Sequence, residues 1–471
     1  MPEKTLVMKF GGTSVGTPAA MGQAAQIVAQ ARSQWPRLVV ITSALSGVTN
    51  LLLESATQAT LGKREHFFQA AQQLRSSHSA IADALIGDPD HRARVMGEIN
   101  LLVDDFNDLC QAIRVIGEAS PRALDSVAAF GERMSVRLLS AALEVQGTPA
   151  QPVESTQLIV TDSRFQDAHP NLEATTQCTR QLLGPVFDAG KVVVTTGFIA
   201  ANQDGVTTTL GRGGSDYSAA LLGAALPADE VWIWTDVDGV MTADPRIVPS
   251  ARTIAELSYR EVAELAYFGA KVLHPKTIRP VIEAGIGLRV CNTFNPEHPG
   301  TRIVPDTHAG TNGKIKAVTA IPGQRLITLE GRGMLGVPGV AARTFGAVAS
   351  TGTSVPLITQ ASSEQSICFA VPAQATPMVL ASLEEVFSAE LARRDIDRIW
   401  ATGDVVIVTA VGAGMRHTPG IAGRVFSTLG DHAVNVIAIA QGSSEVSISL
   451  VVDEENGHAA VRALHELIVN V

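Results

Sequence analysis

Glycines and opposite charges stand together in TTLGRGGSDYSAA, residues 207–219. The glycines are Gly211, Gly213 and Gly214. They leave room for a ligand close to the backbone, while Arg212 and Asp216 put opposite charges into the same turn. The stretch follows a β-like run and leads into an alanine-rich helix, which is typical of a nucleotide-binding loop. Its spacing nevertheless matches none of the standard fingerprints.

A second glycine turn, KFGGTSVG, spans residues 9–16 between an expected first strand and a helix. It is not a Walker A loop, because no Gly-Lys-Ser/Thr closes it, and it does not match GxGxxG. Lys9 precedes the glycines. Lys9 would lie at the strand end and face a phosphate group held by the amides of Gly11 and Gly12 and by the helix N-terminus. By itself the stretch is equally compatible with a structural turn.

TSALSGVTN, residues 42–50, repeats this design after the second expected strand. Ser43 and Thr49 offer hydroxyl groups, and Gly47 allows close approach. A cluster of helix N-cap residues is the alternative interpretation.

The stretch WTDVDGVMTADPRIVP, residues 234–249, follows another expected strand and is rich in turns. Its carboxylates are Asp236, Asp238 and Asp244. A calcium loop is disfavoured because Pro245 interrupts it and no bidentate glutamate stands at the required distance. Thr235 and Asp236 could instead face a nucleotide, with Arg246 on its phosphates. A solvated acidic loop is the alternative.

FGAKVLHPKTIRP, residues 268–280, places Lys271 in an expected helix that stops at His274-Pro275. No nucleophile partner stands near His274 in the sequence, so we expect it to be a structural histidine.

The elements that carry these stretches predict an α/β fold. Residues 5–50 are expected to form a strand–turn–helix–strand unit with ligand-binding turns at the strand ends. Residues 51–118 are expected to be helical, and 122–146 to form an amphipathic helix that contains Glu132. Further short apolar runs are LIVTD (158–162), KVVVTT (191–196), EVWIWTDV (230–237) and LRVCNTF (288–294). Together they predict a mainly parallel sheet covered by helices on both faces.

An internal repeat follows a polar, glycine-containing segment at 306–314. Residues 326–371 align without a gap onto 407–452, at a constant offset of 81 residues. Each copy is expected to form a strand, a loop with Pro-Gly at a helix start, the helix, a strand, a polar turn and a strand. Two small packing modules without a ligand are the alternative interpretation.

The bulk composition excludes several classes of protein. The 471 residues carry a formal net charge of −10 and no basic tract, which argues against a nucleic-acid partner. The four cysteines are scattered without metal-ligand spacing and are expected to be reduced thiols. The start of the chain does not resemble a signal peptide, and no apolar run approaches the length of a membrane span. We therefore expect a cytoplasmic protein without a membrane partner.

In this order, the stretches resemble the aspartate kinase family of the amino-acid kinase superfamily. The resemblance covers residues 5–303 and is carried by KFGGTS, SALSGVTN, FGERMS, TTLGRGGSDY, WTDVDGVMTADPR, FGAKVLHP and NTFNPEHPGT. The repeat resembles the paired ACT regulatory modules of such kinases, and LITQASSEQSICFAVP looks most similar to the threonine-responsive branch. That branch is often fused to homoserine dehydrogenase. No following GxGxxG domain is present here, so a monofunctional kinase is expected unless the sequence is truncated.

The resemblance implies an amino-acid kinase fold, a mainly parallel open sheet between helices, followed by two α+β ACT domains of βαββαβ type. The expected boundaries are 1–305 for the catalytic domain, 306–322 for a linker, 323–399 for the first ACT domain and 400–471 for the second. A C-terminal strand could complete the first ACT domain instead of the second.

It also implies the reaction ATP + L-aspartate → ADP + 4-phospho-L-aspartate, the entry step to lysine, methionine and threonine. The implied catalytic residues are Lys9, Asp216 and Lys271. ATP would be bound by Lys9, Gly11, Gly12, Thr235, Asp236, Met241, Arg246 and Lys271. Aspartate would be bound by Ser43, Thr49, Glu132, Arg212, Gly213 and Gly214. Many relatives carry an aromatic residue where this chain has Met241, which has no hydroxyl group and could pack on an adenine or ribose face.

The expected chemistry needs no general base, because the substrate carboxylate has a pKa of about 3.9 and is ionised at neutral pH. Cationic groups, backbone amides and Mg²⁺ should carry most of the catalysis. Mg²⁺ would be held mainly by the ATP phosphates, without a protein metal site. Other members of the superfamily, acetylglutamate kinase, glutamate 5-kinase or a uridylate kinase, and a non-catalytic amino-acid sensor are the alternatives.

Regulation is expected through the repeat. By the family pattern, the implied effector contacts are Gln360, Gln441, Ser362 and Ser443. Threonine is the first expectation for the effector and lysine the second, and no effector at all stays open. ACT modules commonly pair across subunits, which implies a homodimer or homotetramer.

Overall fold

The computed structural model describes residues 4–269, 273, 275–305, 315–334, 336–360, 365–415 and 417–469. The chain forms two compact units. The first contains Met1–Val240, Ala255–Leu257 and Val272–Pro305, and the second contains Met241–Ile254, Ser258–Lys271 and Asp306–Val471. Among the helices of the described part, none is both long enough and apolar enough to cross a membrane.

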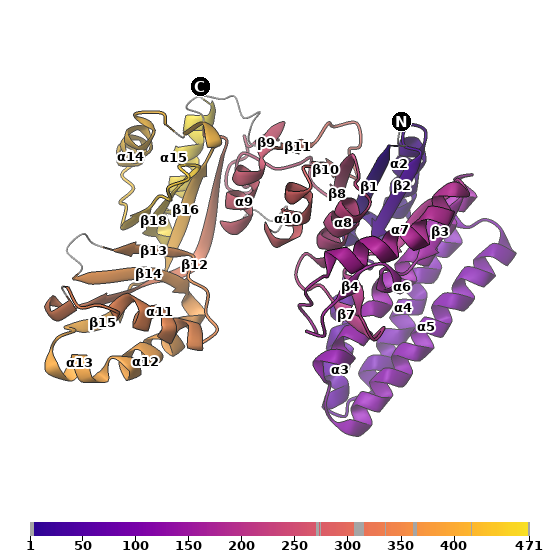
Figure 1. Cartoon of the computed structure of the whole chain (residues 1–471), viewed down its shortest axis with the longest axis horizontal. Coiled ribbons are helices and arrows are strands. Elements are labelled where there is room, and N and C mark those ends of the chain that lie inside the picture. The colour runs from indigo at the N-terminus through magenta and orange to yellow at the C-terminus, as the bar shows by residue number, and fades with distance from the viewer. Residues whose placement is uncertain are drawn as a thin grey trace. The chain divides into compact units, whose positions relative to one another are not determined.

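The main sheet of the first unit has eight strands (Figure 1). In chain order they are β1 (Thr5–Phe10), β2 (Arg37–Thr42), β3 (Ala150–Val153), β5 (Val192–Thr196), β8 (Glu230–Thr235), β9 (Glu256–Ser258), β10 (Gly287–Asn292) and β11 (Thr301–Val304). Their order across the sheet is β3-β5-β2-β1-β8-β10-β11-β9. The six strands from β3 to β10 pair in parallel, and β11 is antiparallel to β10. The predicted mainly parallel sheet is therefore confirmed.

Helices lie on both faces of this sheet, some packed directly on its strands and others on neighbouring helices. They are α1 (Gly12–Val15), α2 (Pro18–Arg32), α3 (Val48–Thr60), α4 (Arg64–Leu85), α5 (Pro89–Ile116), α6 (Pro121–Val145), α7 (Leu172–Asp188), α8 (Gly214–Ala225) and α10 (Pro275–Glu283). The expected helical region 51–118 is confirmed as α3 to α5. The expected helix over 122–146 is α6, whose N-cap Ser120 accepts a hydrogen bond from Ala123 N.

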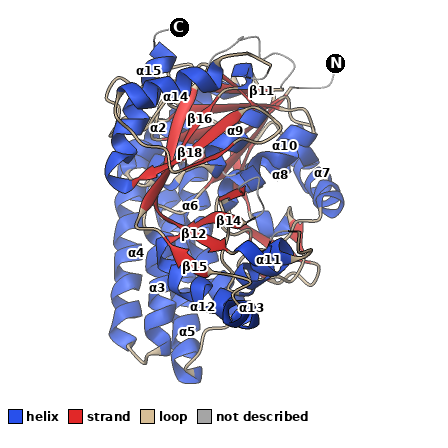
Figure 2. Cartoon of the chain, turned by 90° about the vertical axis from the view of Figure 1, so that its left-hand side faces the viewer, coloured by secondary structure: helices blue, strands red, loops and turns tan. Residues whose placement is uncertain are grey.

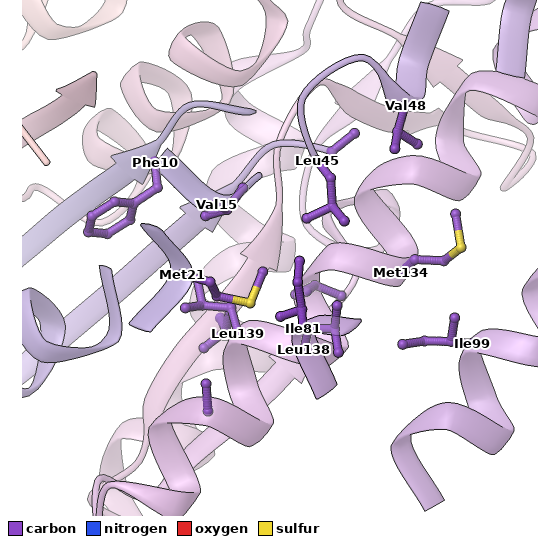
Figure 3. Packing of buried hydrophobic residues seen from close by; sticks show 14 of the residues in the cluster. Phe10, Val15, Met21, Leu45, Val48, Ile81, Ile99, Met134, Leu138 and Leu139 are labelled. Carbon is purple, nitrogen blue, oxygen red and sulfur yellow. The ribbon is translucent and has the colours of Figure 1, made fainter. Parts of the chain in front are cut away.

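Strand alternation decides which side chains reach which helices. Leu6, Met8 and Phe10 of β1 belong to the hydrophobic core shared with α2 to α6, part of which Figure 3 shows. The intervening residues Val7 and Lys9 therefore point to the opposite face. Because α8 packs on β1, β2 and β8, Lys9 is directed toward the start of α8.

A separate three-stranded sheet contains β4 (Val160–Thr161), β6 (Ile199–Asn202) and β7 (Thr207–Thr209). The run 158–162 was expected in the main sheet, and this assignment is wrong because β4 pairs with β6. The run at 191–196 forms β5, and after a turn the chain continues into β6 of the smaller sheet. The chain turns at Gly197, where a Cβ atom would lie 2.7 Å from the Ser215 side chain, and at Phe198, whose φ is 66°.

The second unit contains the repeat. Its helices α11 to α15 are labelled in Figure 2. The first copy has the end of β12 (Ala317–Glu330), then α11 (Val340–Ser350), β13 (Leu357–Gln360), β14 (Ser366–Pro372) and α12 (Thr376–Val386), followed by α13 (Ser388–Arg393) and β15 (Arg398–Ala401). The second copy has β16 (Val405–Val411), α14 (Ile421–Asp431), β17 (Ala438–Ala440), β18 (Ser447–Asp453) and α15 (Gly457–Val469). The helix starts predicted at the Pro-Gly pairs are confirmed, since Gly339 and Gly420 are N-caps with φ of 89° and 86°.

Strands outside each copy complete the shared sheet, whose order is β13-β14-β12-β16-β18-β17 with β15 on β12. Residues 317–321 of β12 pair with β16, whereas residues 327–330 pair with β15. β12 thus begins inside the segment 306–322 that was expected to be a linker. In the described chain β15 pairs with β12 at the first copy, and the last described element is the helix α15.

Two segments expected in the catalytic domain group with the repeat. One is 241–254, and the other carries α9 (Tyr259–Tyr267). Glu261 of α9 is fully buried and accepts hydrogen bonds from Ala413 N at 2.7 Å and from Lys316 Nζ at 3.0 Å. These contacts tie α9 to the residue before β12 and to the turn after β16. The structural division therefore differs from the expected boundary at 305.

Candidate functional site

A cavity of about 480 Å³ lies in the first unit, where the turns after β1, β2, β5 and β7 meet. Its lining residues are Lys9, Gly11, Gly12, Thr13, Ser43, Ala44, Leu45, Ser46, Gly47, Thr49, Asn50, Glu132, Phe198, Gly211, Gly213, Gly214, Ser215 and Asp216. In open α/β sheets, ligands bind in the crevice beyond the carboxyl ends of the strands, and this cavity has that position. The sequence-predicted residues that share the cavity are Lys9, Gly11, Gly12, Ser43, Thr49, Glu132, Gly213, Gly214 and Asp216.

An ion pair joins two of the three predicted catalytic residues. Lys9 Nζ lies 2.6 Å from Asp216 Oδ1, and both side chains are largely buried, with 11% and 16% exposed. Lys9 comes from the end of β1 and Asp216 from the first turn of α8. A lysine held in this way presents a fixed positive charge to an anionic ligand in a weakly screened site.

Three helices start at the cavity, and each has a glycine N-cap. These glycines are Gly11 for α1, Gly47 for α3 and Gly213 for α8. A glycine has no side chain to accept from the backbone N–H groups of the first turn. Val48 N and Gly214 N donate to Leu45 O and Gly211 O, so it is the N–H groups that follow them in each first turn that are suited to anionic ligand oxygens. By contrast, side chains of Thr17 and Ser120 cap α2 and α6.

Steric constraints require glycine at several of these positions. A Cβ on Gly12 would lie 2.9 Å from Ala44 O, and one on Gly214 would lie 2.6 Å from Phe198 Cδ2. Gly213 has a φ of 72°, which L side chains rarely adopt. The turns therefore pack directly against each other and form the cavity wall from backbone atoms.

Glu132 of α6 supplies a buried carboxyl group. Its side chain is 3% exposed, and Oε1 accepts a hydrogen bond from Ala44 N at 3.2 Å. Burial raises the pKa of Glu132 to about 8, and the Ala44 N–H opposes that shift. Within the described residues Oε2 has no hydrogen-bond partner. A cationic ligand group in the cavity would satisfy this atom and favour the ionised form.

Sequence reasoning missed some lining residues. Ser43 Oγ donates to Ser215 Oγ at 3.0 Å, so Ser215 links the turns after β2 and β7. Ser215 stands inside the predicted glycine loop, and its position beside Asp216 could have indicated it. Phe198 gave no signal, because its place in the wall depends on the left-handed turn between β5 and β6.

Other predicted residues lie outside the cavity lining. Arg212 is exposed, although Gly211 and Gly213 on either side of it line the cavity. Thr235 and Asp236 follow Trp234 at the end of β8, and Trp234 O accepts a hydrogen bond from Gly11 N at 3.2 Å. Thr235 and Asp236 thus directly follow a residue that is hydrogen-bonded to the turn at Gly11.

The remaining nucleotide contacts expected from the sequence fall in the second unit or outside the description. Met241 and Arg246 belong to the second unit. Met241 Sδ accepts from Thr253 Oγ1 at 3.6 Å, and the exposed Arg246 pairs with Asp244 at 2.5 Å. Lys271 and His274 lie outside the described residues.

The predicted effector residues lie at the edges of the sheet of the second unit. Gln360 ends β13 and Gln441 follows β17, and both residues are exposed. The two edge strands contact each other, so the curved sheet brings the equivalent positions of the two copies onto neighbouring strands. Ser443 lies in the turn after β17, and Ser362 lies outside the described residues.

The part of the chain that the structure describes contains no group of three or more His, Cys, Asp or Glu residues able to hold a metal ion. Of the carboxylates considered for a calcium loop, Asp238 accepts hydrogen bonds from Asn292 Nδ2 at 2.8 Å and Asn295 Nδ2 at 3.0 Å. Asp244 pairs with Arg246. Asp238 therefore joins its loop to the residues at the end of β10 and after it, whereas Asp244 stabilises its own turn.

Comparisons with known proteins agree with this arrangement. Residues 4–292 match the amino acid kinase family, and residues 327–387 and 408–467 match the ACT domain. The bifunctional aspartokinase/homoserine dehydrogenase 1 of Zea mays is 37% identical over 467 residues, which are 98% of this chain and 50% of that protein. This chain spans about half the length of the bifunctional relatives that it matches.

Two further similarities extend over whole chains. The lysine-sensitive aspartokinase 3 of Escherichia coli is 34% identical over 461 residues, which are 98% of both chains. The crystal structure of E. coli aspartokinase III in complex with aspartate and ADP superimposes with a TM-score of 0.81 at 31% identity, covering 99% of this chain and 100% of that one. This chain belongs to the aspartokinases of the amino acid kinase family and carries two ACT domains.

Proposed function

We propose that the protein is an aspartate kinase, which transfers the γ-phosphoryl group of ATP to the side-chain carboxylate of L-aspartate. The observation that carries the proposal is one cavity that combines the Lys9–Asp216 pair, three glycine-capped helix N-termini and the buried carboxyl group of Glu132. Such a cavity can hold the anionic phosphates and the ammonium group of an amino acid at the same time. The E. coli relative that binds aspartate and ADP supports this assignment.

The phosphates are assigned to the side of the cavity formed by β1 and α8. Lys9 would contact the transferred phosphoryl group, and Asp216, 2.6 Å away, would hold the ammonium of Lys9 in place. Gly11 N already donates to Trp234 O at 3.2 Å, so the Gly12 N–H and the amino end of α1 would donate to phosphate oxygens, with Gly11 allowing their close approach. Fixed positive charges stabilise the charge that develops in the transition state, and this term dominates phosphoryl transfer.

The aspartate substrate is assigned to the neighbouring side, between α6 and the turn after β2. Glu132 would accept a hydrogen bond from the α-ammonium group, because Oε2 is otherwise unpartnered in the described structure. The hydroxyl groups of Ser43 and Thr49 line the same wall. The planar guanidinium group of Arg212 would bind both oxygens of the α-carboxylate. Because Arg212 is exposed, the substrate can reach its side chain.

The base and ribose of ATP are assigned to the region that follows β8. Thr235 and Asp236 are the proposed contacts in the first unit, since the residue before them is bonded to the Gly11 turn. Met241, Arg246 and Lys271 complete the proposed set from the family pattern. Mg²⁺ would be carried by the ATP phosphates and would neutralise part of their charge, which agrees with a cavity lined by few carboxylates.

Threonine is proposed as a feedback inhibitor that binds the ACT domains, with Gln360, Gln441, Ser362 and Ser443 as contacts. The threonine assignment is supported by the resemblance of 357–372 to the threonine-responsive branch. Lysine is the alternative, because the E. coli relative is named as lysine-sensitive. Either inhibitor would regulate the entry step to lysine, methionine and threonine biosynthesis.

A homodimer or homotetramer is proposed to form through the ACT domains. The exposed apolar residues on or beside their edge strands support it, namely Ile358, Ile437 and Ile439, which are 50%, 38% and 45% exposed. A cytoplasmic location is supported by the four cysteines, all of which are free thiols in the structure.

Trapping of the acyl phosphate with hydroxylamine tests the proposed reaction. The chain is incubated with ATP, Mg²⁺ and aspartate, glutamate or N-acetylglutamate, and threonine, lysine and methionine are each titrated into the productive mixture. Hydroxamate is expected from aspartate. Hydroxamate from glutamate or N-acetylglutamate alone would indicate another amino-acid kinase. Amino-acid binding without any hydroxamate would indicate a sensor.

A further inference from the structure

A second buried carboxylate, Asp125, lies on α6 two helical turns before Glu132 and therefore on the same face of the helix. It is 2% exposed, and the mechanism proposed above does not use it. Thr209 donates twice to Asp125, from its backbone N at 3.0 Å and from Oγ1 at 2.8 Å. Gln166 N donates to the two carboxylate oxygens at 3.0 and 3.2 Å.

These donors come from two segments that are distant in sequence. Thr209 ends β7 and directly precedes the glycine loop, whereas Gln166 belongs to the connection between β4 and α7. Gln166 has a φ of 70°, a left-handed conformation that is unfavourable for a residue with a Cβ atom. Burial raises the pKa of Asp125, and the Gln166 and Thr209 donors oppose that shift. The carboxylate thus maintains a strained turn.

The strained turn lies directly against the glycine loop. A Cβ on Gly211 would be 3.1 Å from Gln166 O and 2.9 Å from Asp167 Oδ1. Ala168 N also donates to Thr209 O at 2.9 Å. The position of Gly211, and with it the start of the Arg212 turn, is consequently set by the turn that Asp125 holds.

The other side of the turn is attached to α10. Lys276 Nζ lies 2.5 Å from Asp167 Oδ1, and this contact lowers the pKa of Asp167. Lys276 also lies 5.9 Å from the ring centroid of Tyr217 in α8. The turn is therefore held from both sides, by a buried carboxylate of α6 and by a lysine of α10.

We propose that Asp125 is a positioning residue of the amino-acid subsite. By holding Gln166 and Thr209, it keeps the Gly211–Arg212 turn where Arg212 can bind the substrate carboxylate. The inference rests on the proposed function in assigning Arg212 to the amino-acid substrate. Asp125 acts through the turn that touches the substrate, and its loss displaces that turn. Its hydrogen bonds run to Gln166 and Thr209, whereas Lys9 on the phosphate side of the cavity is paired with Asp216.

The test compares D125N with D229N. Both oxygens of Asp125 accept hydrogen bonds from Gln166 and Thr209. In D125N an NH₂ group replaces one of these oxygens, so that a donor faces a donor and the hydrogen bonds there are lost. Asp229 provides a matched control, because it accepts a backbone hydrogen bond from Thr5 N at 2.8 Å at the amino end of β1, away from the turns that form the cavity. A milder variant, T209V, removes a single hydroxyl donor to Asp125 at nearly constant volume.

For D125N we expect the KM for the amino-acid substrate to rise about tenfold, with the KM for ATP changed less than about twofold. T209V should raise the same KM about threefold, because it removes one of the hydrogen bonds to Asp125. D229N should lower the melting temperature without changing either KM. An unchanged amino-acid KM in D125N and T209V, or an equal rise in both KM values, would overturn the inference.

The same experiment separates the inference from the proposed function. The acceptor used is the amino acid that the wild-type chain phosphorylates in the hydroxylamine panel. If that acceptor is not aspartate, the proposed function is wrong, while the acceptor KM of D125N still decides the role of Asp125.

Discussion

Aspartate is expected to bind more tightly as the pH rises toward 8, because Glu132 must be ionised to accept the substrate ammonium group. Burial raises the pKa of Glu132 to about 8. If only the ionised form binds, the apparent KM is the intrinsic value divided by the ionised fraction. That fraction is about 3% near pH 6.5 and about one half near pH 8, so the KM should fall about 16-fold over this interval.

The assay is the initial rate of ADP formation against aspartate concentration at half-unit pH steps. The KM for ATP, measured in parallel, should change much less. E132Q should bind aspartate weakly at every pH and lose the slope, because its amide does not titrate. E154Q is the matched control, since Glu154 pairs with Arg133 and Arg137 outside the cavity lining, and it should keep the wild-type slope. A flat wild-type profile, or the same slope in E132Q, would refute the reasoning.

The same raised pKa makes a prediction for stability. A carboxyl group with a higher pKa in the folded than in the unfolded state contributes stability below its unfolded pKa and loses it as the pH rises through the folded pKa. The protein without substrate should therefore lose stability between about pH 4.5 and 8 through Glu132, whereas E132Q should lose less. Added aspartate should raise the wild-type melting temperature most strongly near pH 8.

Three further predictions concern other parts of the chain. K9A should lower kcat by about 10² to 10³, measured as ADP formation at saturating substrates, since one fixed cation is lost; a normal kcat would exclude Lys9 from the phosphoryl site. G214A should lower both activity and melting temperature because the new methyl group would lie 2.6 Å from an aromatic ring carbon, whereas G184A, with nothing within 4 Å, should be neutral or slightly stabilising. Q360A and Q441A should weaken threonine inhibition about tenfold or more at unchanged basal rate; inhibition as strong as in the wild type would show that the effector binds elsewhere.

Much of the cavity could be predicted because its chemistry follows from local patterns. Lys9 lies at the end of β1 and Ser43 in the turn after β2, and parallel strands bring their carboxyl ends to one edge of a sheet. Asp216 stands in the first turn of α8, within the glycine loop that the sequence makes visible. The repeat was equally visible, since α11 and α14 begin at positions 81 residues apart, as the sequence offset requires.

Other features depend on partners that sequence patterns do not specify. An apolar run predicts a strand but not its neighbour, which is why 158–162 was placed in the wrong sheet. The raised pKa of Glu132 follows from burial that its helical position alone does not reveal. The bonds from Gln166 to Asp125 join residues 41 positions apart and depend on a backbone conformation rarely adopted outside glycine.

The placement of 241–254 was also outside the reach of the sequence. That segment continues directly from the turn after β8, so the motif suggested a single nucleotide loop. In the structure, Thr242 Oγ1 is hydrogen-bonded to His465 Nε2 of α15 at 2.9 Å, and Val318 N of β12 donates to Thr242 O. Contacts with residues much later in the chain therefore decide which unit holds the segment.

The central claim, that this chain phosphorylates the side-chain carboxylate of aspartate, is tested most directly by identifying the trapped product. After limited turnover with ATP, Mg²⁺, aspartate and hydroxylamine, the hydroxamate is compared by chromatography and mass spectrometry with the authentic α and β isomers, and ADP is quantified in the same sample. Aspartate β-hydroxamate is expected in a one-to-one ratio with ADP. The α isomer, or ADP release without any hydroxamate, would contradict it.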